Sequence, residues 1–138
     1  MITHHLDLAA VRKQMTSPGG AIYKDLLKRG LLVETAAKKN LGAGPKRVNT
    51  GRLRASITHQ FITVNGMPAM IVGTNVVYAI YVHDGTGIYG PKGQRIHPKN
   101  KRAMRWKGKG VTGYIFAKST AGMRPNPFLK NALHAAKY

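Results

Sequence analysis

Near the N-terminus, hydrophobic positions recur at helical spacing. Asp7 can cap a short helix that ends near Met15. A longer apolar stripe predicts a second helix over 21–41. The members of this stripe are Ile22, Leu26, Val33, Ala37 and Leu41. Gly30 lies inside the second helix, where glycine costs about 1 kcal/mol relative to alanine, so it indicates close packing against a neighbouring element.

The central part of the chain changes to the alternation that is typical of strands. Residues 56–64 are rich in β-branched types, and the Asn-Gly pair at 65–66 predicts a two-residue hairpin turn. The return strand is predicted over 69–73. A second strand pair is predicted over 102–107 and 111–119, on either side of a glycine-rich turn.

The order of these elements predicts the fold class. Pro127 is a favourable first residue for a closing helix. Helices, then strands, then a helix predict an α+β fold, in which an antiparallel sheet of about four strands packs against a long N-terminal helix and a short C-terminal helix. We expect one domain over 1–138, made of a helical arm (1–20), a helix and hairpin body (21–91), and a part with the basic loop, second hairpin and closing helix (92–138).

The stretch 78–86 separates two parts of the chain with different patterns. It is apolar up to Val82, and Asp84 is the last acidic residue of the chain. Its apolar residues fit one face of a short helix or one face of a strand, and their spacing does not decide between the two. Gly85 allows a positive φ, which suits a sharp turn. We interpret the stretch as a core anchor followed by a turn.

The charge of the chain is strongly unbalanced. It has 23 Lys and Arg against 4 Asp and Glu, a formal net charge of +19. Self-repulsion on this scale weakens a compact state unless anionic neighbours offset it. The chain has no cysteine, which excludes a disulfide framework and a thiolate metal site. No apolar run approaches the roughly 18 residues of a membrane span, so we expect a soluble protein without a membrane partner.

The strongest chemical signal is a basic segment that starts at Lys92. Its cations are Lys92, Arg95, Lys99, Lys101, Arg102, Arg105, Lys107 and Lys109. Phosphate contacts need mobile cations but no base-reading geometry. We therefore predict that the segment contacts DNA or an acidic partner. Sequence-specific readout is not expected, because the sequence contains neither a recognition-helix pattern nor an aromatic-platform pattern.

Other motifs do not support catalysis or cofactor binding. The run 85–90 fits GxGxxG, but no helix start and no acid follow it, so we interpret it as a loop. The histidines lack metal-ligand spacing, and carboxylates are few. His83 and Asp84 are adjacent and should point in different directions, which does not suit a base and its orienting acid. We expect no enzyme activity, no cofactor and no metal.

Three motifs occur in an order that resembles a known family. They are TGRLRASI at 50–57, YAIYVHDGT at 78–86 and RPNPFLKNAL at 124–133. Together they are similar to the minor tail, or tail-completion, proteins in the neck of long-tailed bacteriophages. The similarity covers the chain from about Thr50 onward. His83 stands where members of this family often have a glutamate.

The resemblance implies a structural virion protein without catalytic activity. It implies an α+β subunit of a homo-oligomeric, hexameric ring that joins the head connector to the tail and surrounds the DNA channel. The implied partners are the head-connector and tail-terminator or tail-tube proteins, with double-stranded DNA in the channel, and the implied location is the head–tail junction of the virion after assembly in the host cytoplasm. The motif residues and expected core anchors are Gly51, Leu53, Ile57, Tyr78, Ala79, Tyr81, Gly85, Thr86, Pro127, Phe128, Leu129 and Ala132. The alternative is a free nucleic-acid-binding protein with sequence-independent phosphate contacts.

Overall fold

The computed structural model describes residues 7–42, 51–108 and 110–136. The chain divides into two compact units. Unit 1 combines the chain up to Val76 with the closing segment from Phe128, and unit 2 spans Val77–Pro127. The closing helix therefore belongs with the long helix and the first hairpin, and not with the basic loop as the predicted subdivision had it. That both units form a single domain stays a prediction.

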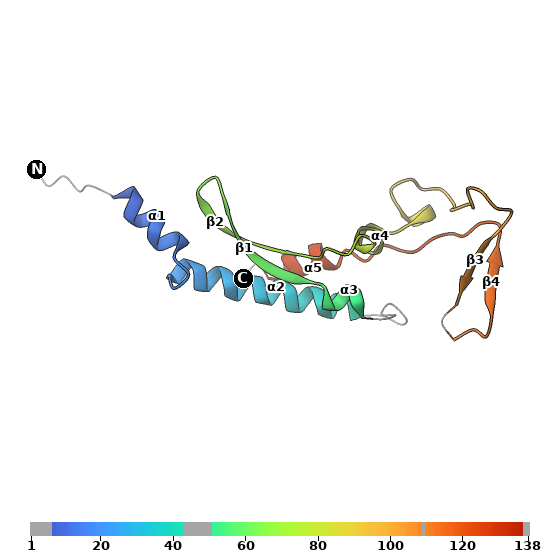
Figure 1. The fold of residues 1–138 in the computed structure, drawn as a ribbon, viewed down its shortest axis with the longest axis horizontal. Coiled ribbons are helices and arrows are strands. Elements are labelled where there is room, and N and C mark those ends of the chain that lie inside the picture. The colour runs from blue at the N-terminus through green and yellow to red at the C-terminus, as the bar shows by residue number, and fades with distance from the viewer. Residues whose placement is uncertain (1–6, 43–50, 109, 137–138) are drawn as a thin grey trace, which may run out of the picture. The chain divides into compact units, whose positions relative to one another are not determined.

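Two helices open unit 1, as the hydrophobic spacing predicts (Figure 1). Helix α1 (Leu8–Thr16) is capped by Asp7, whose Oδ1 accepts hydrogen bonds from the backbone N–H groups of Ala9 at 2.9 Å and Ala10 at 3.2 Å. Helix α2 (Ala21–Gly42) follows after a short turn. Both helices are confirmed to within about one residue at each end.

A hairpin forms the sheet of unit 1. Strands β1 (Thr58–Val64) and β2 (Met67–Gly73) pair antiparallel along their whole length. The predicted turn is confirmed, because Asn65 and Gly66 have φ angles of 51° and 76°. Two positive φ angles are the signature of a turn whose twist matches that of the flanking strands. A short helix, α3 (Arg52–Ala55), precedes the hairpin and was not predicted.

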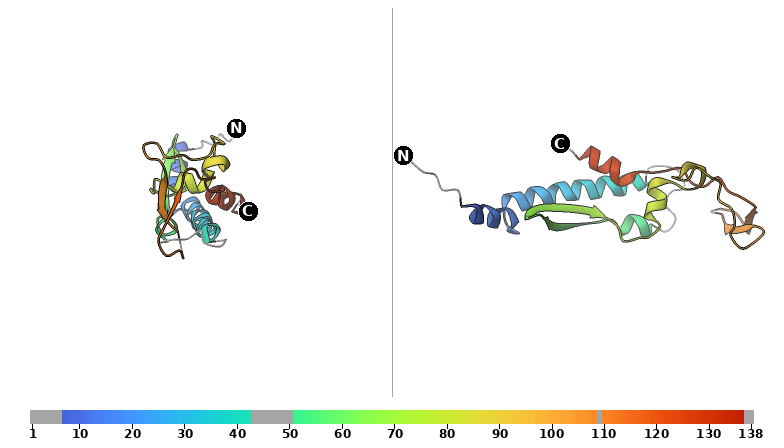
Figure 2. Two further views of the ribbon diagram at one scale, coloured as in Figure 1. Left: turned by 90° about the vertical axis from the view of Figure 1, so that its right-hand side faces the viewer. Right: turned by 90° about the horizontal axis from the view of Figure 1, so that it is seen from above.

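Helix α2 is the centre of unit 1. The hairpin packs on it, and so does the closing helix α5 (Phe128–Ala135), which begins one residue after the predicted start. Viewed from above, α5 and the hairpin flank α2 (Figure 2). Asn40 of α2 donates a hydrogen bond from Nδ2 to the backbone oxygen of Phe128 at 3.2 Å. The buried hydrophobic residues of the unit are Val33, Ala37, Leu41, Leu53, Ile57, Phe128 and Ala132.

Unit 2 contains shorter elements. Helix α4 (Ala79–Asp84) shows that the apolar stretch is helical, and a 3₁₀ helix, η1 (Gly87–Tyr89), occupies part of the run interpreted as a loop. Strands β3 (Met104–Lys107) and β4 (Tyr114–Ala117) form the second predicted hairpin, in shorter form. The α+β class and the four strands are confirmed, but the strands form two separate two-stranded sheets.

Backbone hydrogen bonds hold two segments of unit 2 together, and we call this arrangement the glycine clasp. The N–H of Thr86 donates to the oxygen of Met123, and the N–H of Ile88 donates to the oxygen of Ala121, both at 2.9 Å. A Cβ atom at Gly87 would lie 2.1 Å from the Ala121 oxygen. The glycines of the GxGxxG run therefore permit close backbone approach within the chain.

Candidate functional site

The basic segment of unit 2 is exposed to solvent. This holds for Lys92, Arg95, Lys99, Lys101, Arg102, Arg105 and Lys107, whereas Lys109 lies outside the described residues. Arg95 is held in place by a hydrogen bond of 3.0 Å from its Nε to the Oγ of Ser119. Between Tyr89 and β3 the segment is irregular apart from a bridge that pairs Ile96 with Thr120. The cations therefore lie on an irregular, exposed surface that is tethered at these two points.

The hairpin of β3 and β4 places cations and aromatic rings on one face. Arg105 pairs with Phe116, and Lys107 pairs with Tyr114, so the four side chains project from the same side. The Cζ atom of Arg105 lies 4.4 Å from the centre of the Tyr114 ring. Phe116 is 66% exposed and Tyr114 is 57% exposed. No aromatic platform was predicted from the sequence, although the alternate positions of Tyr114 and Phe116 in a strand that follows two spaced cations were a signal for one.

His83 and Asp84 form a hydrogen bond of 2.7 Å between Nδ1 and Oδ1. The prediction that these adjacent side chains point apart is wrong. They lie at the end of α4, where Gly85 with its φ of 81° terminates the helix and leaves regular helical geometry. A histidine paired with a carboxylate can serve base catalysis, but catalysis also needs a positioned nucleophile or a substrate pocket. The pair alone does not make a catalytic site.

Every acidic side chain of the chain already has a partner. Asp7 caps α1, Asp84 pairs with His83, and Asp25 Oδ2 pairs with Arg29 Nε at 2.8 Å. Glu34 joins Lys38 and His59, each at 2.5 Å. The hydrogen bond with His59, followed by that with Lys38, holds the pKa of Glu34 below its usual value. The surplus positive charge can therefore be compensated only from outside the chain.

The expected core anchors divide into buried and exposed residues. Buried are Leu53, Ile57, Ala79, Gly85, Phe128 and Ala132, and half-buried are Gly51, Thr86, Pro127 and Leu129. Tyr78 is 42% exposed and Tyr81 is 57% exposed, so the core-anchor prediction is wrong for these two. Their neighbours Val77 and Ile80 are 85% and 60% exposed. These four side chains, which we call the α4 apolar patch, leave α4 with an uncovered apolar surface.

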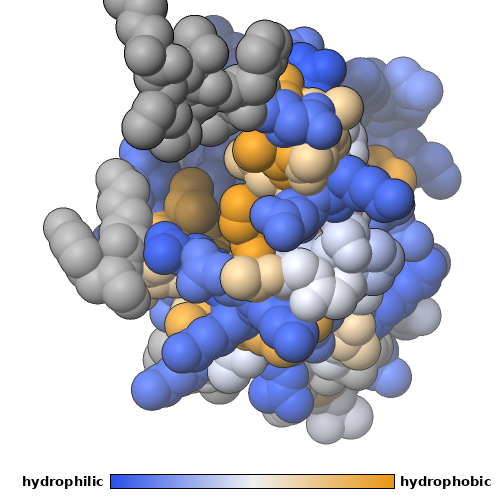
Figure 3. Space-filling model, turned by 90° about the vertical axis from the view of Figure 1, so that its left-hand side faces the viewer, coloured by the Kyte–Doolittle hydropathy of each residue, from blue (hydrophilic) through white to orange (hydrophobic). Residues whose placement is uncertain are grey.

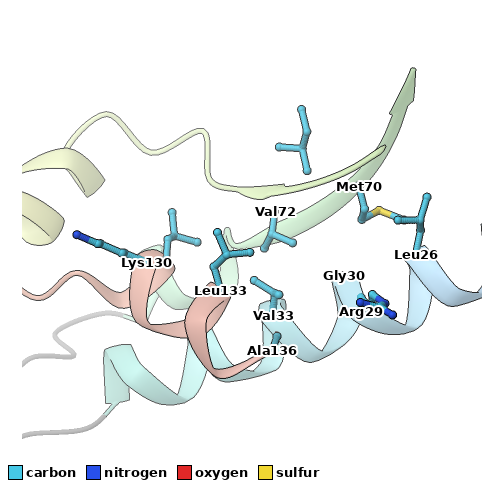
Figure 4. A pocket seen from close by; sticks show the side chains of 11 residues that line it. Leu26, Arg29, Gly30, Val33, Met70, Val72, Lys130, Leu133 and Ala136 are labelled. Carbon is cyan, nitrogen blue, oxygen red and sulfur yellow. The ribbon is translucent and has the colours of Figure 1, made fainter. Parts of the chain in front are cut away.

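Unit 1 contains an apolar groove of about 650 Å³ between α2, β2 and α5. Val33, Val72 and Leu133 point toward the same space from these three elements (Figure 4). Arg29 and Lys130 contribute cations to its lining. Elsewhere on the surface, the face drawn in Figure 3 shows hydrophobic patches separated by hydrophilic side chains. Together with the α4 apolar patch of unit 2, this groove shows that both units expose apolar surface to solvent.

Comparison with known proteins gives no match. No protein-family model, no curated protein and no solved structure matches the chain. In the part of the chain that the structure describes, no helix is long and apolar enough to cross a membrane. Within the same residues, no group of three or more His, Cys, Asp and Glu side chains could hold a metal ion.

Proposed function

We propose that this chain is a structural protein of the bacteriophage neck. In this proposal, copies of the chain form a homo-oligomeric ring that joins the head connector to the tail and surrounds the DNA channel. The resemblance of the three sequence motifs to tail-completion proteins motivates the proposal. A subunit of such a ring needs an apolar surface that contacts neighbouring subunits, and positive charge that faces DNA or acidic neighbours.

The observation that carries the proposal is the arrangement of the motif at 78–86. Thr86 at its end is engaged in the glycine clasp, whereas Val77, Ile80 and Tyr81 of the α4 apolar patch are exposed to solvent. An exposed cluster of large apolar side chains on a held backbone favours contact with another protein. Tyrosine is also enriched in the centres of protein interfaces. An anchored contact helix of this kind suits a subunit of an assembly.

The charge of the chain supports the same proposal. Its four acidic residues are engaged within their own units, and the formal net charge is +19. A ring of such subunits would accumulate a charge that cannot remain uncompensated. DNA in a central channel, or acidic surfaces of adjacent rings, would compensate it.

Charge reversal in the basic segment tests the proposal. We expect the Lys99→Glu, Lys101→Glu and Arg102→Glu triple variant to fail in joining heads to tails, since three exposed cations would become acids. A matched triple variant, with glutamate at Lys24, Lys28 and Lys39 of α2, makes the same charge change at exposed positions of unit 1. Counting joined particles by electron microscopy measures the outcome. Normal joining by the first variant would overturn the proposal for this segment.

One observation favours the alternative of a free nucleic-acid-binding protein. Arg105 and Tyr114 form a cation–aromatic contact on an exposed hairpin face, which suits nucleic acid as well as a protein neighbour. A free binding protein would remain a monomer and lose affinity steeply as salt rises. A ring subunit would instead form complexes of defined mass, so the mass of the purified species separates the two functions.

A further inference from the structure

We propose that the exposed face of the β3–β4 hairpin binds single-stranded nucleic acid. In this proposal, unpaired bases stack on Phe116 and Tyr114, and phosphates contact Arg105 and Lys107. We call these four residues the ribbon face. The proposal adds a binding site and a ligand class that a ring around duplex DNA does not require.

The strand register defines the ribbon face. Arg105 lies opposite Phe116 and Lys107 lies opposite Tyr114, so β3 contributes two cations to this face and each of them meets a ring of β4 across the hairpin. The contact of Arg105 with the Tyr114 ring confirms that diagonal neighbours meet on this side. Two residues along a strand span about 7 Å, roughly twice the 3.4 Å repeat of stacked bases in DNA. The rings are therefore spaced for bases that have left a continuous stack.

The opposite side of the hairpin has a different character. It carries Met104, Trp106, Ile115 and Ala117, of which all but Trp106 are half-buried. A Cβ atom at Gly108 would lie 2.7 Å from Ile115 Cδ1, so the Ile115 side chain packs under the turn. This side packs within unit 2, which leaves the ribbon face as the open side of the hairpin.

Charge and exposed rings together select the ligand class. Asp84 is the single acidic residue of unit 2, and it is already engaged with His83. The ribbon face therefore needs anions from outside. An acidic protein segment would satisfy Arg105 and Lys107 but brings no planar group for each ring. Duplex DNA supplies phosphates but keeps its bases inside, whereas a single strand supplies a phosphate and an accessible base at every nucleotide.

Binding of labelled oligonucleotides to the full chain tests the proposal. We expect a 20-nucleotide oligothymidylate to bind more tightly than a 20-base-pair duplex, with fluorescence anisotropy as the measurement. Replacing Phe116 by Leu should weaken single-strand binding about 10-fold, because stacking on one ring contributes roughly 1–3 kcal/mol. Phe116→Trp should retain the affinity. Duplex binding should change by less than about 3-fold in both variants, since phosphate contacts remain.

Two further variants separate the contributions of rings and cations. Replacing both Arg105 and Lys107 by Gln should lower the slope of log affinity against log salt by about 1.4 for single strands, because two phosphate contacts are lost. Tyr89→Leu removes a 40% exposed ring of the same unit that lies outside the hairpin and should leave the affinity unchanged. Equal binding of duplex and single strand, with no effect of Phe116→Leu, would overturn the proposal. Displacement of the oligonucleotide by polyglutamate at equal charge concentration would also overturn it, in favour of an acidic protein partner.

Discussion

Gly30 of α2 and Met70 of β2 meet so closely that a Cβ atom at position 30 would lie 2.6 Å from Met70 Cγ. Real side chains do not approach one another to this distance, so the glycine determines how near the hairpin lies to the helix. Val33, Ala37 and Leu41 continue the same helix face and are buried. The contact thus explains why a residue that disfavours helices occupies the middle of the longest helix described.

Replacing Gly30 by alanine is expected to destabilise unit 1. Alanine favours a helix by about 1 kcal/mol, but the Met70 side chain or the hairpin must move, at a typical cost of about 1–3 kcal/mol. We expect a net loss of about 1 kcal/mol in the free energy of unfolding, measured by urea denaturation. Gly19→Ala should stay within about 0.5 kcal/mol, since nothing lies within 4 Å of its added Cβ. A stabilising Gly30→Ala would refute the close contact, and Met70→Ala should recover the loss in a double-mutant cycle.

The pairing of Glu34 with His59 and Lys38 predicts a pH dependence of stability in the acid range. The folded-state pKa of Glu34 lies below its usual value of 4.5. Its contribution to stability is therefore fully present above pH 4.5 and is lost as the pH falls through the folded-state pKa. Glu34→Gln should lower the free energy of unfolding by roughly 1–3 kcal/mol at about pH 5.5, and the difference from wild type should shrink toward pH 3.

The control for this prediction is the exposed pair of Asp25 and Arg29, whose side chains are 57% and 60% exposed. Asp25→Asn should change stability by less than about 1 kcal/mol at low ionic strength, because solvent screens the pair. Parallel stability curves for Glu34→Gln and wild type, from about pH 5.5 to pH 3, would show that the Glu34 carboxylate contributes nothing.

The glycine clasp predicts a strong effect of a single methyl group in unit 2. Gly87 has a φ of +66°, and its added Cβ would meet the Ala121 oxygen. Gly93 has a φ of +59° with nothing within 4 Å of its added Cβ. Gly93→Ala should therefore cost only the backbone strain of about 1–2 kcal/mol, whereas Gly87→Ala should open the clasp. Amide hydrogen exchange at Ile88 should accelerate at least about 100-fold in the Gly87 variant and little in the Gly93 variant; equal rates in the two would contradict the steric explanation.

Sequence patterns correctly predicted those structural elements that depend on residues close together in the chain. The Asn-Gly turn at 65–66, the cap at Asp7 and the helical stripe of α2 each depend on neighbouring residues, and the structure has them at the expected places. The glycine clasp could not be predicted in this way. The Thr86 hydroxyl accepts a hydrogen bond from the N–H of Met123 across 37 residues, and no short-range periodicity reports such a pair.

The surfaces were harder to predict than the elements. Apolar spacing at 78–82 indicated a hydrophobic face, but it does not tell whether that face packs against the same chain or against another one. For this reason the exposure of Tyr78 and Tyr81 could not be predicted from the sequence. The ribbon face depends on the register of β3 against β4, which aligns Lys107 with Tyr114. The lengths of the predicted strands did not determine this register. The positions of the cations could be predicted, whereas the rings beside them could not.

The mass of the complexes that the purified chain forms tests the proposed assembly role most directly. Native mass spectrometry should be performed on the full chain with and without the head-connector ring of a phage that encodes it. Ile80 lies in the α4 apolar patch and is 60% exposed, and Ile80→Asp places a charge there. Asn75→Asp introduces the same charge at an exposed polar position as a control. We predict a closed oligomer for wild type and Asn75→Asp, and a monomer for Ile80→Asp; a wild-type chain that stays monomeric with and without the connector would contradict the account.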